Sequence, residues 1–324
     1  MKTMQWLIRR EMWEHKGMLL RAPLVLAAVM LVLGVISMLK LLAVGTLHLN
    51  INGHHSHVNG ASFAAIVVDR NPDMLDQAVA NYMASAMPLL LMLAVVVFFY
   101  CLGALYDERR DRSLLFWKSL PVSDAATVLS KAALALLVAP LVAIVVGSLL
   151  SMLLLLLLCG VMAVHGLNLF GAVLANPAFY LGPLRMLGLL PVYALWALPT
   201  VGWLLMVSAW ARSKVFLWAV GVPLLAALLA VWAGRALALD LNGPWFFEHI
   251  VGHILLGVVP GCWLLFERAG LSADFIDGSR HIDMGDIFTQ SWATLASPGA
   301  WTGVAAGAAM LYAAVWLRRR RDEG

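Results

Sequence analysis

The chain has 324 residues, of which 62% are hydrophobic and 12% are charged, and its formal net charge is +4. A mean hydropathy of +0.87 excludes a water-soluble globular domain, because a soluble chain of this length cannot cover so much apolar surface. The sequence therefore predicts an integral membrane protein.

Apolar runs close to the ~20 residues that an α-helix needs to cross a bilayer recur along the whole chain. They predict an all-α polytopic fold in a single membrane domain, 1–324, whose six transmembrane helices span about 22–45, 84–105, 132–159, 184–210, 215–233 and 300–317. The strands of a membrane β-barrel would instead be about 10 residues long with alternating polarity.

Residues 1–21 precede the first predicted span and mix aromatic and apolar residues with charges. Met4, Leu7, Ile8 and Met12 fall on one side of a helix. This pattern predicts an N-terminal interfacial helix with its basic residues near anionic lipid headgroups. The alternative is a charged leader that only sets the topology.

Two long segments, 46–83 and 234–299, separate predicted spans on the opposite side of the membrane. The Asn/Gly/His-rich stretch 52–60 is predicted to be a loop, and residues from Met74 to Met87 to begin the second span as an outer-surface helix. The apolar run 249–266 contains two histidines and Pro260-Gly261. We expect it to lie on the outer leaflet or dip into it without crossing.

The positions of lysine and arginine predict the orientation. Basic clusters flank the spans at 2–21, 109–131, 212–214 and 318–321, and these four regions alternate correctly with six spans. Because basic residues accumulate on the cytoplasmic side, both termini are expected in the cytoplasm.

Several chemistries find little support in the sequence. No phosphate-binding loop of the Gly-x-x-x-x-Gly-Lys-Ser/Thr type occurs, so ATP binding by this chain is not expected. The predicted spans lack paired charges near their midpoints, which disfavours a self-sufficient ion-coupled transporter. His249 and His253 are spaced i, i+4 beside Glu248 and are weak metal-ligand candidates, with interfacial histidines as the alternative. The histidines within 54–57 are similarly open to metal binding or simple solvation.

Residues 106–131 form a dense charged island between two apolar runs. Tyr106–Arg112 continues the second span as a charged helical end, and Phe116, Trp117 and Leu120 supply apolar side chains. Pro121 ends any helix before it, and Ser123 or Asp124 can cap the next one. We predict a short helix flat against the membrane that docks another protein, since aromatics and arginines anchor many interfaces. An amphipathic loop lying on lipid is the alternative.

These residues resemble the type-2 permeases of ATP-binding-cassette (ABC) transporters. The resemblance rests on Arg9-Arg10-Glu11, on Asp107-Glu108-Arg109-Arg110, on the stretch Ser-Leu-Leu-Phe-Trp-Lys-Ser-Leu-Pro-Val-Ser over 113–123, and on Ser297-Pro298 and Trp301 opening a last span that ends in Arg318–Arg321. It covers nearly the whole chain in the order of the spans. The two large outer regions depart from the family pattern.

The resemblance implies a non-catalytic permease subunit of an exporter, paired with a second permease subunit and with a cytoplasmic ABC ATPase that binds ATP and Mg. It implies no cofactor in this chain, membrane lipid as its surroundings and no nucleic-acid partner. The implied coupling residues are Arg9, Arg10, Glu11, Asp107, Glu108, Arg109, Arg112, Phe116, Trp117, Lys118, Leu120 and Pro121. An amphipathic or lipid-like cargo is favoured.

Two alternatives stay open: a membrane-embedded metal-dependent hydrolase that uses Glu248, His249 and His253, and a non-transporting scaffold or sensor linked to an ATPase.

Overall fold

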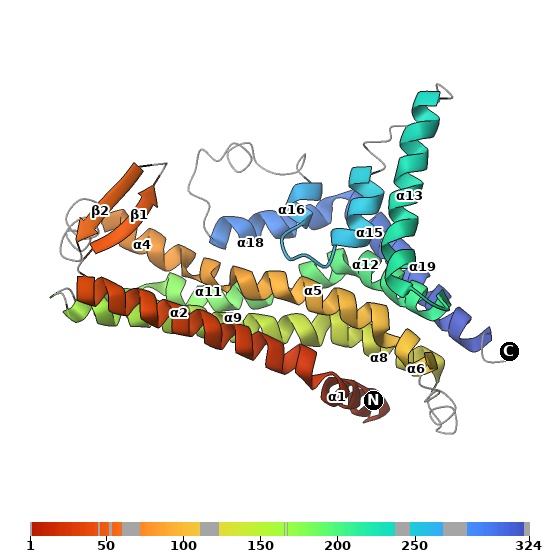
Figure 1. The fold of residues 1–324 in the computed structure, drawn as a ribbon, viewed down its shortest axis with the longest axis horizontal. Coiled ribbons are helices and arrows are strands. Elements are labelled where there is room, and N and C mark those ends of the chain that lie inside the picture. The colour runs from red at the N-terminus through yellow and green to blue at the C-terminus, as the bar shows by residue number, and fades with distance from the viewer. Residues whose placement is uncertain are drawn as a thin grey trace.

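The structure is a computed structural model, and it describes residues 2–44, 46–51, 54–59, 72–110, 123–164, 166, 168–236, 247–267 and 284–320. Within these ranges six helices are long and apolar enough to cross a membrane: Gly17–Lys40, Ala78–Arg110, Asp124–Val164, Pro177–Trp210, Val215–Ala233 and Pro298–Arg320. The predicted all-α polytopic fold is confirmed. The two chain termini lie at the same end of the bundle (Figure 1).

The N-terminal helix α1 (Lys2–Glu14) packs on the start of the third span, helix α8 (Asp124–Ala133). Leu7 is buried, whereas Trp6 and Trp13 on other sides of the helix are exposed. The apolar side of α1 is therefore turned toward the bundle, and the two tryptophans are left outside.

A π-helical turn precedes a proline in two of the spans. Turn η1 (Gly17–Arg21) leads into α2 (Ala22–Val44) just before Pro23, and η3 (Leu134–Val138) leads into α9 (Ala139–Val164) just before Pro140. The amides of Ala22 and Ala139 bond to carbonyls five residues earlier, at Gly17 and Leu134. Because proline lacks an N–H and crowds the preceding turn, a wider turn lets the helix continue past it.

The segment after α2 corrects the prediction of a loop over 52–60. Strands β1 (Thr46–Ile51) and β2 (His54–Asn59) form an antiparallel hairpin in which Ile51 pairs with His54. The two residues between them in the sequence are Asn52 and Gly53, the dipeptide most typical of a tight hairpin. A helix is present where one was expected between Met74 and Met87: α4 (Pro72–Asn81) continues through the 3-10 turn η2 (Tyr82–Ala86). Its location on the outer surface stays a prediction.

The second span continues as α5 (Met87–Ala104) and α6 (Tyr106–Arg110), and α9 is followed by α10 (Phe170–Ala175) and α11 (Pro177–Gly188). Asn176 caps α11 through its side-chain oxygen, which accepts from the Ala178 amide. The same side chain donates to Asp76 Oδ1 at 2.7 Å and so ties α11 to α4 at the end of the bundle away from the termini.

Helix α12 (Leu190–Trp210) is the centre of the bundle and packs most extensively on the last helix, α19 (Pro298–Arg320). A Cβ on Gly307 would lie 2.7 Å from the Leu198 carbonyl carbon, and one on Gly202 would lie 2.6 Å from the Gly307 oxygen. Glycines at 299, 303 and 307 give α19 the small-residue spacing that lets two membrane helices approach closely.

Helix α13 (Val215–Ala236) meets the composition of a span but runs steeply across the direction of α2, α5 and α9 (Figure 1). Its first half is held by the bundle: the Trp203 indole donates to the Ala219 carbonyl at 2.9 Å, and Phe216 lies against Phe98 and Phe99. Its far half exposes Leu228, Leu229 and Trp232.

The run 249–266 is broken, as its Pro-Gly pair indicates. It forms the π turn η4 (Phe247–Val251), α15 (Gly252–Leu256) and α16 (Trp263–Phe266), with Gly261 at a φ of +87° between the last two. No continuous helix of spanning length forms over 247–267. Helix α18 (Met284–Ala293) and the 3-10 turn η6 (Thr294–Ala296) then lead into α19.

The three cysteines, Cys101, Cys159 and Cys262, are buried and unbridged. Burial raises the pKa of the Cys262 thiol to about 12, so this side chain stays protonated at neutral pH. They behave as small core residues.

Candidate functional site

At the end of the bundle that holds both termini, a lysine is buried between two carboxylates. Lys131 on α8 is 1% exposed, and its ammonium nitrogen lies 3.0 Å from both carboxylate oxygens of Glu11 on α1. It also lies 2.9 Å from Glu108 Oε1 on α6. One side chain therefore joins three helices that are distant in the sequence.

The chain of charges continues to the last helix. Arg318 of α19 contacts the other oxygen of Glu108 through NH1 at 2.8 Å and Asp124 Oδ1 of α8 through Nε at 3.0 Å. We call Glu11, Lys131, Glu108, Arg318 and Asp124 the ion network. It connects α1, α6, α8 and α19 in one continuous set of charge-assisted bonds.

Further groups surround the buried carboxylate of Glu11. The Tyr100 hydroxyl donates to Glu11 Oε2 at 3.2 Å, Arg10 NH2 lies 4.0 Å from Oε1, and His15 Nε2 lies 3.9 Å from Oε2. With Arg10 included, three acidic side chains face three basic ones. Removing charges from water is unfavourable unless each is paired and hydrogen-bonded, and here the pairing is complete.

A second contact fixes α6, which leads into residues 111–122. The amides of Leu105 and Tyr106, at the break between α5 and α6, donate to Ser208 Oγ of α12 at 3.1 and 3.0 Å. The Arg109 guanidinium donates to the carbonyls of Ser208 and Ala211, the latter at 2.9 Å. The side chain of Ser208 thus replaces helical acceptors at the break, and Arg109 binds carbonyls at the end of α12.

The predicted coupling residues divide into three groups. Arg9 and Asp107 are exposed at the surface. Glu11, Glu108 and Arg109 point inward and bond to other groups of this chain. Arg10 is partly buried beside Glu11. Arg112, Phe116, Trp117, Lys118, Leu120 and Pro121 lie outside the described residues.

Sequence reasoning missed the roles of Lys131, Arg318 and Tyr100, and treated the first two only as topology signals. One sign of burial was present: Glu11 lies three residues after Ile8 and four after Leu7, within the apolar side of α1. The prediction that Ser123 or Asp124 begins α8 is confirmed for Ser123, whose Oγ accepts from the Ala126 amide at 3.2 Å. Asp124 instead pairs with Arg318.

The weaker metal hypothesis gains no support at His253. Its ring lies 4.4 Å from the ring of Phe266 and 5.1 Å from that of Trp196, and its carbonyl accepts from Thr200 Oγ1 at 2.7 Å. Among the described residues, no three His, Cys, Asp or Glu side chains are grouped so as to hold a metal ion. The side chains of Glu248 and His249 are outside the part that is described.

Comparison of the chain with protein-family models, with curated proteins and with solved structures finds no match. The function of this chain must therefore be inferred from its sequence motifs and from the geometry of this end of the bundle.

Proposed function

We propose that this chain is the permease subunit of an ATP-driven ABC exporter in a bacterial inner membrane, paired with a second permease subunit and with a separate cytoplasmic ATPase. The multi-pass membrane fold and the motif resemblance at 9–11, 107–110 and 113–123 support this proposal. On this view the chain forms the translocation path and carries out no chemistry itself.

The observation that carries the proposal is how residues 111–122 are flanked. Glu108 precedes this segment, Asp124 follows it, and Arg318 binds both carboxylates. Lys131 extends the connection to Glu11 on α1, and Arg109 extends it to α12. A force applied to 111–122 by a docked ATPase would reach α1, α8, α12 and α19 through bonds that resist stretching.

In this arrangement the side chains have separate tasks. Those within 111–122, together with exposed Arg9 and Asp107, would contact the ATPase. The ion network would keep α1, α6, α8 and α19 moving as one unit. Basic residues that only set the membrane topology can be exposed. That role does not require Lys131 to be 1% exposed and shared by two carboxylates.

The test is purification of the tagged, full-length chain from its native membranes. We expect it to retain an ABC ATPase, identified by its peptides and by Mg-ATP hydrolysis in nanodiscs. Recovery of the folded permease without any ATPase, under conditions that preserve other membrane complexes, would contradict the proposal.

The docking segment is tested by Phe116→Ala and Trp117→Ala. Because interface free energy concentrates in buried aromatic anchors, each should weaken the complex by about 1–3 kcal/mol. Trp232→Ala is the matched control, since Trp232 is 61% exposed and lies on the far half of α13, a helix that extends away from α6 and α8 (Figure 1). Equal ATPase retention by the double variant and the control would exclude 111–122 as the docking segment.

A further inference from the structure

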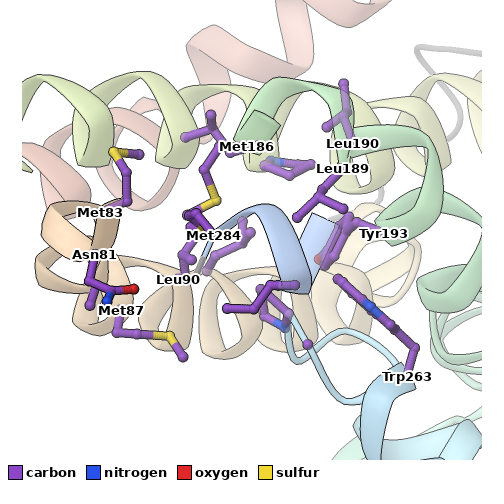
Figure 2. Close-up of a pocket in the computed structure, with 17 residues that line it drawn as sticks. Asn81, Met83, Met87, Leu90, Met186, Leu189, Leu190, Tyr193, Trp263 and Met284 are labelled. Carbon is purple, nitrogen blue, oxygen red and sulfur yellow. The ribbon is translucent and has the colours of Figure 1, made fainter. Parts of the chain in front are cut away.

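A cavity of about 150 Å³ lies in the half of the bundle away from the termini. It is enclosed by η2 and α5, by α9, by the junction of α11 and α12, by α18, and by the turn at Pro260-Gly261. Figure 2 shows Asn81, Met83 and Met87 at one end, Tyr193 and Trp263 at the other, and Met186 and Met284 between them. The cavity is separate from the ion network and belongs to one chain.

The interior of the cavity is apolar. The polar atoms of its two aromatic residues point to other partners: the Tyr193 hydroxyl donates to the Val258 carbonyl at 3.3 Å, and the Trp263 indole donates to Ser291 Oγ at 2.8 Å. An apolar cavity of this volume accepts a group about as large as benzene. The lining therefore favours a hydrocarbon group and disfavours a charged or strongly polar one.

One end of the cavity carries a polar side chain. Asn81, a half-buried amide, lies there beside exposed Met87 and Ala84. A ligand that enters between these residues would keep its polar part near Asn81 and place its apolar part inward. This is the shape of an amphiphile, and the surrounding spans give it access from the hydrocarbon of the bilayer.

The walls are suited to an apolar group of variable shape. Four of the lining residues are methionines, at 83, 87, 186 and 284, whose unbranched thioether side chains fill irregular spaces. One wall is the turn at Gly261, which has a φ of +87° and lies between α15 and α16. The methionine walls can change shape without breaking a directional bond.

We propose that this cavity binds a short length of the hydrocarbon chain of the amphiphile that the exporter moves, with the polar group of the amphiphile held near Asn81. The identity of the amphiphile as cargo rests on the proposed function, but binding at the cavity does not. The site is in one subunit and is distinct from a path between two permeases.

The binding experiment uses palmitate carrying a diazirine photolabel, added to the full-length chain in nanodiscs without ATP. We expect saturable adducts on peptides that contain Met186, Met284 and Trp263, displaced by unlabelled palmitate. Ala84→Trp fills the entrance and should reduce this labelling about tenfold, equivalent to about 1.4 kcal/mol of binding free energy. Val95→Trp, on the exposed side of α5 in the same span, should not.

Met87→Phe provides a second obstruction if the Ala84 variant does not accumulate, because Met87 also lines the entrance and is exposed. Labelling spread over the exposed sides of α2 and α13 and insensitive to either obstruction would overturn the site. This readout does not involve the ATPase, so its failure is separate from failure of the proposed function.

A second experiment tests whether the bound amphiphile is cargo. If it is cargo, palmitate should stimulate ATP hydrolysis by the complex, and Ala84→Trp should reduce the stimulation in step with its weaker labelling, whereas Val95→Trp should keep it. Cavity labelling with stimulation that is equal in Ala84→Trp and Val95→Trp would identify a resident membrane lipid and overturn the assignment as cargo.

Discussion

The two ends of the bundle are held together by different forces. At the end with the termini, Lys131 and Arg318 bind Glu11, Glu108 and Asp124 at distances of 2.8–3.0 Å. At the other end, methionines and leucines surround a cavity of about 150 Å³, and neutral hydrogen bonds fix only its aromatic walls.

The two ends should therefore respond differently when their helices are displaced. Charge-assisted bonds are short, directional and about twice as strong as neutral hydrogen bonds, so the helices of the ion network should move together. Dispersion contacts are weak individually and not directional, so a flexible methionine side chain can form new ones after it shifts. The charged end suits the transfer of force from 111–122, and the apolar end suits a change of shape around a ligand. If the comparison is right, substitutions should be costly at the first end and mild at the second.

Removal of the shared cation should have the largest effect. Lys131→Met leaves Glu11 and Glu108 buried without their common partner, and breaking a buried pair in this way costs about 3–5 kcal/mol. The free energy of unfolding can be measured in mixed micelles of detergent and SDS. Lys16→Met is the control, because Lys16 is exposed on the same side of the membrane. A Lys131→Met variant as stable as the control would show that the network contributes nothing.

A conservative change at Arg318 should have the next largest effect. Arg318 uses two nitrogens, NH1 and Nε, to reach carboxylates on different helices, and a single ammonium cannot reproduce that fork. Arg318→Lys should lose about 1.5–3 kcal/mol, the range for a hydrogen bond to a charged group. Arg320→Lys, at an exposed position over the Trp316 ring, should lose less than about 1 kcal/mol. Equal losses would mean that charge alone matters at the end of α19.

The sequence predicted the elements far better than their pairing. Long apolar runs predicted the six spans, the Pro-Gly pair argued against a seventh span over 249–266, and Ser123 was foreseen as a helix cap. These features depend on neighbouring residues. The ion network instead joins positions 120 residues apart, Glu11 and Lys131, and 210 apart, Glu108 and Arg318. No local pattern encodes which distant charge meets which.

Two features that the sequence analysis did not predict were nevertheless indicated by local sequence patterns. Glu11 falls inside the apolar side of α1, where a charge is expected only if it is paired. The Asn-Gly dipeptide at 52–53 is a strong hairpin signal, but histidine and asparagine around it suggested a loop. The cavity had no signal of its own, because its lining residues are ordinary span residues until several helices come together.

At the apolar end, loss of one neutral hydrogen bond should have an intermediate effect. Trp263→Phe removes the donor to Ser291 Oγ, which is fully buried, so the hydroxyl is left without this partner at a cost of about 1–3 kcal/mol. Trp292→Phe on α18 is the control, since Trp292 is exposed. Unfolding in mixed micelles again provides the measurement. A loss greater than that of Lys131→Met would reverse the order of the two ends.

The smallest effect is expected from a volume-conserving change inside the cavity. Met186 lines the cavity and is 6% exposed, yet its contacts are apolar and its neighbours include flexible Met83 and Met284. Swaps between leucine and methionine in a core usually cost less than about 1.5 kcal/mol, and the empty space beside Met186 should keep the cost near the lower end. Lys131→Arg is the corresponding conservative change at the charged end. It keeps the charge but must fit a larger, planar group into a site where the lysine is 1% exposed, so it should lower the free energy of unfolding more than Met186→Leu does. If Met186→Leu is instead the more damaging of the two, the apolar end is packed as tightly as the charged end, and it cannot be the adaptable half of the bundle.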